Sequence, residues 1–369
     1  MKRKHIAIIV ESAHGHINPT LGIASQLVSR GYDVSYAVKE NFAPRVRSTG
    51  SKAVVYKPLE NKLTVFRQMQ ENGGGQEYLF DFNTSNLAAL SRAIREEIHD
   101  THKQLTELYE TDKPDLIMYD VLNMAGKSMA TEWGIPTIVH SPMLIPRNAG
   151  FLEGESLVIV TLPRFFQQDA DELDSRYRFV GPVFNDGSFF KPWKSGVSAE
   201  HAILVSASTG LLPSIEYFKT AVDAFRDCSH RVVLSIGDEI DPASLGFIPD
   251  NFEINQYSSQ SEILMSAELF VGQGGALSIV EALRFGVPVV LCPPSQTHDL
   301  YARRAAELGL GVCIRKADFS ASVLRESAVS VLSDHVILDR VREFKVNIQE
   351  SRGAETAADL IESFIISHG

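Results

Sequence analysis

The feature that most constrains this chain is a regular alternation of short apolar runs with helix-like segments, from one end to the other. Short, continuous apolar runs are typical of parallel strands that are buried on both faces. In the first half these runs occupy residues 6–10, 33–38, 53–58, 115–120, 136–141, 157–161 and 177–181. Strand–helix alternation predicts an α/β fold of doubly wound parallel sheets, with helices on both faces.

The alternation starts again after residue 200, which divides the chain in two. Between the halves lies FNDGSFFKPWKSGVSAE, residues 184–200, which is rich in Gly, Pro and Ser and is interpreted as a linker. At ~100–200 residues per domain, a chain of 369 residues corresponds to about two domains. We therefore predict a first domain over residues 1–190 and a second over residues 191–355.

The loop ESAHGHINP follows the first apolar run and holds His14 and His16. Asn18-Pro19 predicts that a helix begins there, with Asn18 as N-cap, and Gly31 predicts where that helix ends. Open parallel sheets bind ligands beyond the carboxyl ends of their strands, so a histidine in this loop could act as a general base. Three interpretations compete with this one. They are a packing or capping histidine, a metal pair, for which H-x-H alone is weak evidence, and a dinucleotide-binding turn, for which Gly15 alone does not supply the G-x-G-x-x-G pattern.

Asp120 closes the apolar run LIMYD, at the carboxyl end of another predicted strand. A carboxylate in this position can orient a histidine and stabilise its protonated form, and it can equally cap the helix that follows. If both strands belong to one sheet, Asp120 and a histidine of the first loop could form a pair.

The segment FVGQGGALSIVEAL (270–283) reads as a strand, a glycine-rich turn and a helix, an arrangement that binds phosphate through backbone N–H groups. Gly274 and Gly275 would let a ligand approach the backbone, and Glu281 could reach a ribose hydroxyl. The turn carries a neutral amide, Gln273, and tight strand–helix packing is the alternative explanation. SASTG (206–210) is the matching loop in the second half, and it fits a phosphate or an ordinary turn.

Composition excludes several classes of protein. The net charge is −11 and no stretch is dense in Lys or Arg, which argues against nucleic acid as a partner. No apolar run reaches the ~18 residues of a membrane span, and the N-terminal run is interpreted as a strand because His14 and His16 follow too soon for a signal peptide. Three scattered cysteines, Cys228, Cys292 and Cys313, indicate buried thiols in a reducing compartment, so we expect a cytoplasmic protein. Nothing in the sequence indicates the oligomeric state.

Asp169-Ala170-Asp171 resembles the D-x-D motif of metal-dependent sugar transferases. It lies in the acidic run QQDADELDS with no strand before it, so a solvated loop is the better interpretation. No other segment suggests a metal site.

Taken in order, these loops resemble those of the GT-B glycosyltransferases that use nucleotide sugars, and specifically the macrolide glycosyltransferase group that is similar to the UDP-glycosyltransferases. The N-terminal signature corresponds to AHGHINPTLGIASQLVSRGYDVSYAV, and the central strand–helix–strand to DLIMYDVLNMAGKSMATEWGIPTIVHSP. The donor-binding signature corresponds to FEINQYSSQSEILMSAELFVGQGGALSIVEALRFGVPVVLCP. The resemblance covers nearly the whole chain.

The resemblance implies a GT-B fold, in which two Rossmann-like domains face a cleft, the first binding the acceptor and the second the donor. It implies that residues 356–369 form a helix that packs back on the first domain. The reaction it implies is inverting and needs neither metal nor cofactor, with His16 as base and Asp120 as its partner. The acceptor would be a small hydrophobic natural product and the donor a UDP- or dTDP-sugar. The implied donor contacts are Ser208, Thr209, Tyr257, Gln260, Gln273, Gly274, Gly275, Ser278, Glu281, Thr297, His298 and Asp299.

The sequence departs from the family pattern in the donor half. Gln273 occupies the place of a histidine that faces the diphosphate, and Gln cannot carry positive charge. Leu277 stands where the family has a small residue or Asn. Thr297 and His298, followed by Asp299, replace an acidic residue and Gln that bind the sugar hydroxyls, which suggests a donor other than UDP-glucose, such as a deoxysugar.

Two other functions are compatible with these departures. A non-catalytic relative could bind a nucleotide sugar or assist another transferase, although the retained His16 and Asp120 favour an enzyme. A sugar-nucleotide epimerase would need acid–base residues in the donor half, where His298 is the candidate. The transferase explains the most residues and is the leading hypothesis.

Overall fold

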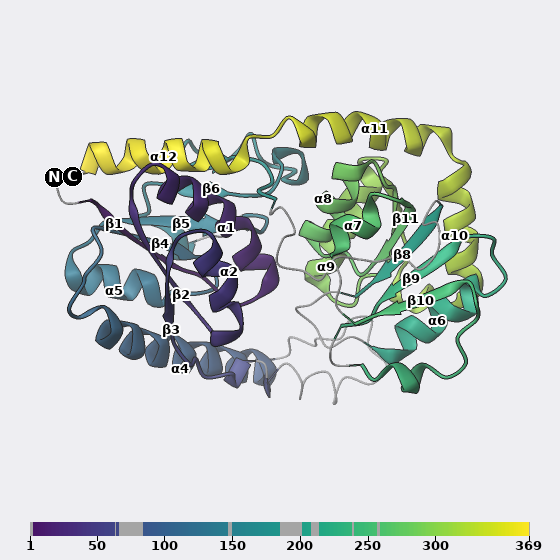
Figure 1. Ribbon diagram of the computed structural model, residues 1–369, viewed down its shortest axis with the longest axis horizontal. Helices are drawn as coiled ribbons and strands as arrows, with labels where there is room; N and C mark the ends of the chain where they lie inside the picture. The colour runs from purple at the N-terminus through teal and green to yellow at the C-terminus, as the bar shows by residue number, and fades with distance from the viewer. Residues whose placement is uncertain are drawn as a thin grey trace. The chain divides into compact units, whose positions relative to one another are not determined.

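The computed structural model describes residues 3–62, 64–65, 84–146, 150–184, 201–207, 214–237, 240–256 and 259–368. These residues form two compact units, each built around one parallel sheet (Figure 1). The first unit comprises the described residues up to 184 and those from 351 onward, and the second comprises those from 201 to 350. The chain therefore returns to the first unit at Ser351 rather than at residue 356. The predicted linker lies almost entirely outside the described residues.

The sheet of the first unit has the strand order β3-β2-β1-β4-β5-β6-β7, and every pair in it is parallel. Its strands are β1 (His5–Ile9), β2 (Asp33–Val38), β3 (Lys52–Val55), β4 (Leu116–Asp120), β5 (Thr137–Ser141), β6 (Val158–Val160) and β7 (Tyr177–Phe179). The chain runs outward in one direction from β1 and in the other from β4. The carboxyl edge between these two strands is therefore a topological switch point, where such sheets form ligand crevices.

Helices cover both faces of this sheet (Figure 1). They are α1 (His14–Ser29), α2 (Ala43–Ser48), α4 (Thr84–Tyr109), α5 (Ala125–Trp133) and α12 (Gly353–His368), with the short 3₁₀ turns Glu40–Phe42, Gly150–Leu152 and Arg164–Phe166. On one face α12 packs against α1, and Ile361 shares a core with Ile17 and Leu21. On the other face α5 lies so close to β4 that a Cβ at Gly126 would stand 2.6 Å from that of Tyr119.

The start of α1 corrects the sequence-based prediction. The helix begins at His14 with Ala13 as N-cap, and Pro19 lies inside it rather than in its first position. The Ala13 carbonyl accepts from the N–H groups of His16 (3.0 Å) and Ile17 (2.9 Å), which closes the first turn before the proline. Because Pro19 has no N–H, it cannot donate to the Gly15 carbonyl four residues earlier in the helix. His16 therefore stands on a helix and not in a loop.

The end of α1 is as predicted. Gly31 has φ +93° and donates its N–H to the Val28 carbonyl at 2.9 Å. Tyr32 donates to the Leu27 carbonyl at 3.1 Å, which completes a Schellman motif.

The second unit repeats the topology, with strand order β10-β9-β8-β11-β12-β13. Its strands are β8 (Ala202–Ser206), β9 (Arg231–Ser235), β10 (Phe252–Asn255), β11 (Ala267–Gly272), β12 (Val289–Leu291) and β13 (Gly311–Cys313). Its helices are α6 (Ile215–Phe225), α7 (Gln260–Leu264), α8 (Ala276–Phe285), α9 (Gln296–Glu307), α10 (Ala321–Ser333) and α11 (His335–Gln349), with 3₁₀ turns at Pro242–Leu245 and Lys316–Asp318. The switch point lies between β8 and β11, next to the glycine-rich turn. Within the described residues no helix is both long and apolar enough to cross a membrane.

Candidate active site

Three neighbouring strands of the first sheet end in polar residues on the same face. Asp120 ends β4, His140 lies in β5, and Thr161 follows β6, and all three are completely buried. The positions two residues earlier in these strands, such as Met118 and Ile138, belong to the core under α1. Because side chains alternate between the faces of a strand, the polar residues continue this face beyond the edge of the core.

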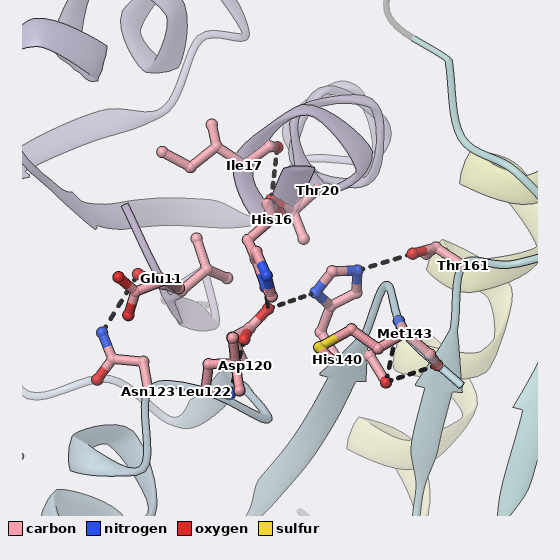
Figure 2. Close-up of polar contacts among 12 residues, drawn as sticks. Glu11, His16, Ile17, Thr20, Asp120, Leu122, Asn123, His140, Met143 and Thr161 are labelled. Carbon is pink, nitrogen blue, oxygen red and sulfur yellow. Dashed lines mark hydrogen bonds and ion pairs between the residues drawn. The ribbon is translucent and has the colours of Figure 1, made fainter. Parts of the chain in front are cut away.

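These residues and His16 form a continuous chain of hydrogen bonds (Figure 2). His16 Nδ1 lies 2.8 Å from Asp120 Oδ2, and His140 Nδ1 lies 3.2 Å from the same oxygen. His140 Nε2 lies 3.0 Å from Thr161 Oγ1. The second carboxylate oxygen, Oδ1, accepts the backbone N–H of Leu122 at 2.8 Å. Asp120 is thus held on both oxygens.

The charges in this chain follow from burial and pairing. Burial opposes ionisation of Asp120, but the charge of His16 and hydrogen bonds from both histidines outweigh it and lower the pKa of Asp120 below its usual range. Burial also opposes the charge on His16, yet the Asp120 carboxylate outweighs it and raises the pKa of His16. Burial lowers the pKa of His140. Asp120 is therefore ionised, and its carboxylate holds a proton on His16 Nδ1.

The other nitrogen of His16 is available for chemistry. Among the described residues no group hydrogen-bonds to His16 Nε2. With its proton on Nδ1, the imidazole presents a lone pair at Nε2, as a general base requires. Glu11 also raises the pKa of His16, while Lys62 lowers it.

His14 has a different environment. Arg45 Nη1 lies 2.9 Å from His14 Nδ1, and the His14 ring meets Phe42 edge-on with centroids 5.0 Å apart. Burial, followed by the charge of Arg45, lowers the pKa of His14 to about 4. His14 is therefore neutral at pH 7 and accepts a hydrogen bond from a cation, whereas His16 faces a carboxylate.

In the second unit the predicted phosphate turn joins β11 to α8. Gly275 is the N-cap of α8, and no side chain caps this end. Gly274 has φ +85°, and a Cβ there would stand 2.7 Å from the His298 carbonyl oxygen. Gln273 is buried, and Ser278 lies in the first turn of α8, half-buried. The N-terminal N–H groups of α8 thus remain without a side-chain cap, as anion binding requires.

Glu281 and Gln260, both predicted donor contacts, are hydrogen-bonded to one another. Gln260 Nε2 donates to Glu281 Oε2 at 2.6 Å, and the Ser261 hydroxyl donates to Oε1. Burial raises the pKa of Glu281, although both hydrogen bonds oppose this. The N-terminus of α7 thereby fixes the carboxylate on α8.

The remaining donor candidates lie at the start of α9. Ser295 caps this helix, and its hydroxyl lies 2.8 Å from His298 Nδ1. Burial lowers the pKa of His298 to about 4, so its imidazole is neutral at pH 7. Asp299 is buried and pairs with Arg303 at 2.5 Å, while Thr297 is exposed.

The structure thus brings His16 together with Asp120, Gln260 with Glu281, and Gly274 with His298. Ser208, Thr209 and Tyr257 lie outside the described residues. His140, Thr161 and Ser261 were missed by the sequence analysis. For the first two a signal existed, since PTIVHS and LVIVT end in polar residues in the same frame as LIMYD.

The D-x-D motif, Asp169-Ala170-Asp171, ends in an exposed aspartate that is paired with a cation. Asp171 is paired with Arg164 at 2.6 Å, with its side chain 98% exposed. Within the described part of the chain no three His, Cys, Asp or Glu side chains are grouped so that they could hold a metal ion. All three cysteines are free thiols, but of the predicted buried thiols only Cys292 is buried, whereas Cys228 and Cys313 are partly exposed.

Known proteins resemble the chain along its whole length. The model of the erythromycin biosynthesis protein CIII-like C-terminal domain matches residues 219–362. The NDP-glycosyltransferase YjiC of Bacillus licheniformis is 33% identical, with 100% of both chains covered. The oleandomycin glycosyltransferase of Streptomyces antibioticus is 29% identical, covering 97% of this chain and 90% of the relative.

Solved structures agree with the sequence comparisons. The glycotransferase of kitacinnamycin superposes with a TM-score of 0.82 at 28% identity, covering 99% of this chain and 100% of that one. A calicheamicin glycosyltransferase also gives 0.82, at 26% identity and 100% coverage of both.

Fold and relatives together define a GT-B glycosyltransferase that depends on a nucleotide sugar. Within that class the chain belongs to the macrolide and UDP-glycosyltransferase family. The predicted family, fold class and enzyme class are confirmed, and the transferase is the function that the comparisons support among the three considered.

Proposed function

We propose that the protein transfers a sugar from a UDP- or dTDP-sugar to a hydroxyl of a small hydrophobic natural product of macrolide or polyphenol type, with inversion at the anomeric carbon. The observation that carries this proposal is the hydrogen bond of 2.8 Å between His16 Nδ1 and Asp120 Oδ2 at the switch point of the first sheet. The acceptor class is supported by the relative that is named for oleandomycin.

In the proposed reaction His16 Nε2 removes the proton of the acceptor hydroxyl. The oxygen attacks the anomeric carbon from the face opposite the nucleoside diphosphate, which leaves as the new glycosidic bond forms. Asp120 stabilises the imidazolium that His16 becomes, because it stays ionised and accepts from Nδ1. A positioned base of this kind contributes ~10²–10⁴-fold to the rate.

The leaving diphosphate would be stabilised by the N-terminus of α8. Gly274 and Gly275 bring the backbone close, and the uncapped N–H groups with the helix dipole favour negative charge. Gln273 adds a neutral donor in the same turn. Because these donors are amides, the proposed stabilisation of the leaving group is metal-independent and needs no cofactor.

The remaining proposed donor residues would bind the ribose, the base, the phosphates and the sugar. Glu281, fixed by Gln260 and Ser261, would bind the ribose hydroxyls. Tyr257 would stack on the base, and Ser208 and Thr209 would cover the phosphates. The start of α9, with Thr297, His298 and Asp299, would bind the sugar.

The test is turnover with a panel of UDP- and dTDP-sugars against macrolide and flavonoid acceptors, measured in parallel for the wild type and His16→Ala. We expect a glycosylated product with the inverted anomeric configuration, at a rate that depends on His16 and is insensitive to EDTA. Binding of UDP and dTDP, measured by calorimetry, should be equal in the two proteins. Undiminished turnover in the variant, or a retained configuration, would contradict the proposal.

A further inference from the structure

His140 lies directly beside Asp120 in the sheet. The two are register partners in adjacent parallel strands, and the backbone N–H of Val121 donates to the His140 carbonyl at 3.1 Å. Neither side chain is exposed to solvent. A polar residue this deep in a core is costly unless its hydrogen bonds are satisfied, and both ring nitrogens of His140 have a partner.

We propose that His140 is a positioning residue that sets the basicity of His16 through the carboxylate of Asp120. The inference rests on the proposed function, in which His16 is the base. His140 reaches His16 only through Oδ2 of Asp120, which accepts hydrogen bonds from both rings, at 2.8 Å and 3.2 Å (Figure 2).

The hydrogen bonds fix the tautomer of His140. Asp120 is ionised and can only accept, so His140 must carry its proton on Nδ1. Its Nε2 is then an acceptor, and Thr161 Oγ1 donates to it at 3.0 Å. The Thr161 hydroxyl therefore keeps the Nδ1 proton of His140 directed at Asp120.

This arrangement limits how strongly Asp120 attracts the proton of His16. A second hydrogen bond on Oδ2 stabilises the ionised carboxylate and makes it a weaker acceptor for the first. Burial keeps His140 itself neutral, so the positive charge that develops in the reaction is confined to His16. Without His140, Asp120 would hold the imidazolium more tightly, and a larger fraction of His16 would be protonated at neutral pH.

The other charged groups around His16 act from different elements. Glu11 follows β1, and Lys62 Nζ lies 2.7 Å from Glu11 Oε2 and 3.2 Å from Glu97 Oε2, so this cation is matched by two carboxylates. In the described part of the chain His140 hydrogen-bonds only to Asp120 and Thr161. A substitution at residue 140 therefore leaves the Glu11–Lys62–Glu97 cluster unchanged.

Two isosteric variants separate the contacts of His140. The amide nitrogen of Asn occupies the place of Nδ1 and keeps the donor to Asp120. The amide nitrogen of Gln occupies the place of Nε2, so Gln loses the donor to Asp120 and instead donates to the Thr161 hydroxyl. For His140→Gln we expect the pKa on the acid limb of kcat/KM to rise by about one unit, with about a tenfold loss at pH 6. For His140→Asn we expect the wild-type profile. The His16 imidazole pKa, followed by NMR in the ligand-free protein, should move in the same way.

A second pair of variants changes Thr161, which hydrogen-bonds to His140 but not to Asp120. Thr161→Val removes the hydroxyl that donates to His140 Nε2 and lets His140 adopt the other tautomer. The pKa of His16 should therefore rise, as in His140→Gln, but by a smaller amount. Thr161→Ser retains the hydroxyl and should restore the wild-type profile. The inference is overturned if Gln and Asn at residue 140 behave alike, or if the His16 resonance titrates unchanged in His140→Gln and Thr161→Val. The NMR titration is independent of turnover, so it separates this failure from a failure of His16 as the base.

Discussion

A Cβ carbon at Gly274 would lie 2.7 Å from the carbonyl oxygen of His298. The glycine-rich turn and the start of α9 are therefore in close backbone contact, although they are separate segments of the second unit. Both were predicted as donor contacts from sequence, and this close approach gives a physical reason for them to act as one site.

Gly274→Ala should destabilise the second unit and weaken nucleotide binding. The substitution combines the left-handed backbone at φ +85° with overlap of a backbone oxygen, for an expected cost of about 1–3 kcal/mol. Gly309→Ala is the matched control, since φ is +72° there and the nearest atom is an ordinary 3.6 Å away. Urea unfolding and UDP calorimetry measure both effects. Equal losses in the two variants would show that the contact with His298 is unimportant.

His16→Ala should lower kcat by about 10³-fold and leave nucleotide binding intact, because it removes the base but no part of the second unit. The control is His14→Ala, which removes a neutral imidazole that faces Arg45 rather than a carboxylate. We expect less than a tenfold change for the control. Product formation under saturating donor and acceptor measures both, and a reversed order would assign the base to His14.

Asp120→Asn should change the pH profile as well as the rate. Asp120 raises the pKa of His16, so loss of its charge lowers that pKa, and the acid limb of kcat/KM moves to lower pH. The rate at the plateau should fall by about 10²–10⁴-fold because the imidazolium loses its counter-charge. The control is Asp115→Asn, which also removes a negative charge, but from a partly exposed carboxylate at the opposite end of β4. An acid limb that stays in place in Asp120→Asn would contradict the pairing.

His298 should make the stability of the second unit dependent on pH. Its pKa falls from an ordinary value of 6.5 to about 4 on folding, so the unfolded chain binds a proton more readily. The stabilisation is complete above pH 6.5 and is lost as the pH falls toward 4, by on the order of 2–3 kcal/mol. Urea midpoints between pH 7 and pH 4 should therefore decline less in His298→Gln than in the wild type. Parallel declines in the two proteins would rule out this contribution.

The sequence was sufficient to predict the strands and the residues at their carboxyl ends. A short continuous apolar run indicates a buried strand, and the polar residue that ends the run marks the carboxyl end of that strand. On this basis Asp120 could be paired with a histidine of the first loop, and the family resemblance selected His16 rather than His14. His140 was missed although it ends an apolar run in the same frame as Asp120, because only its register with Asp120 shows what it contacts, and register depends on tertiary pairing. The start of α1 was misplaced for a related reason. Pro19 is preferred in the first helical turn, and only the bonds of the Ala13 carbonyl show that the turn forms earlier.

The position of α12 ties the completion of the first unit to the order of synthesis. Ala357, Ala358 and Ile361 fill the core that Ile17 and Leu21 of α1 begin. On the ribosome these late residues emerge only after the whole second unit, so the nascent first unit exposes an apolar strip of α1 until then. The core of the half that holds the proposed base can therefore be completed only after the second unit has been translated.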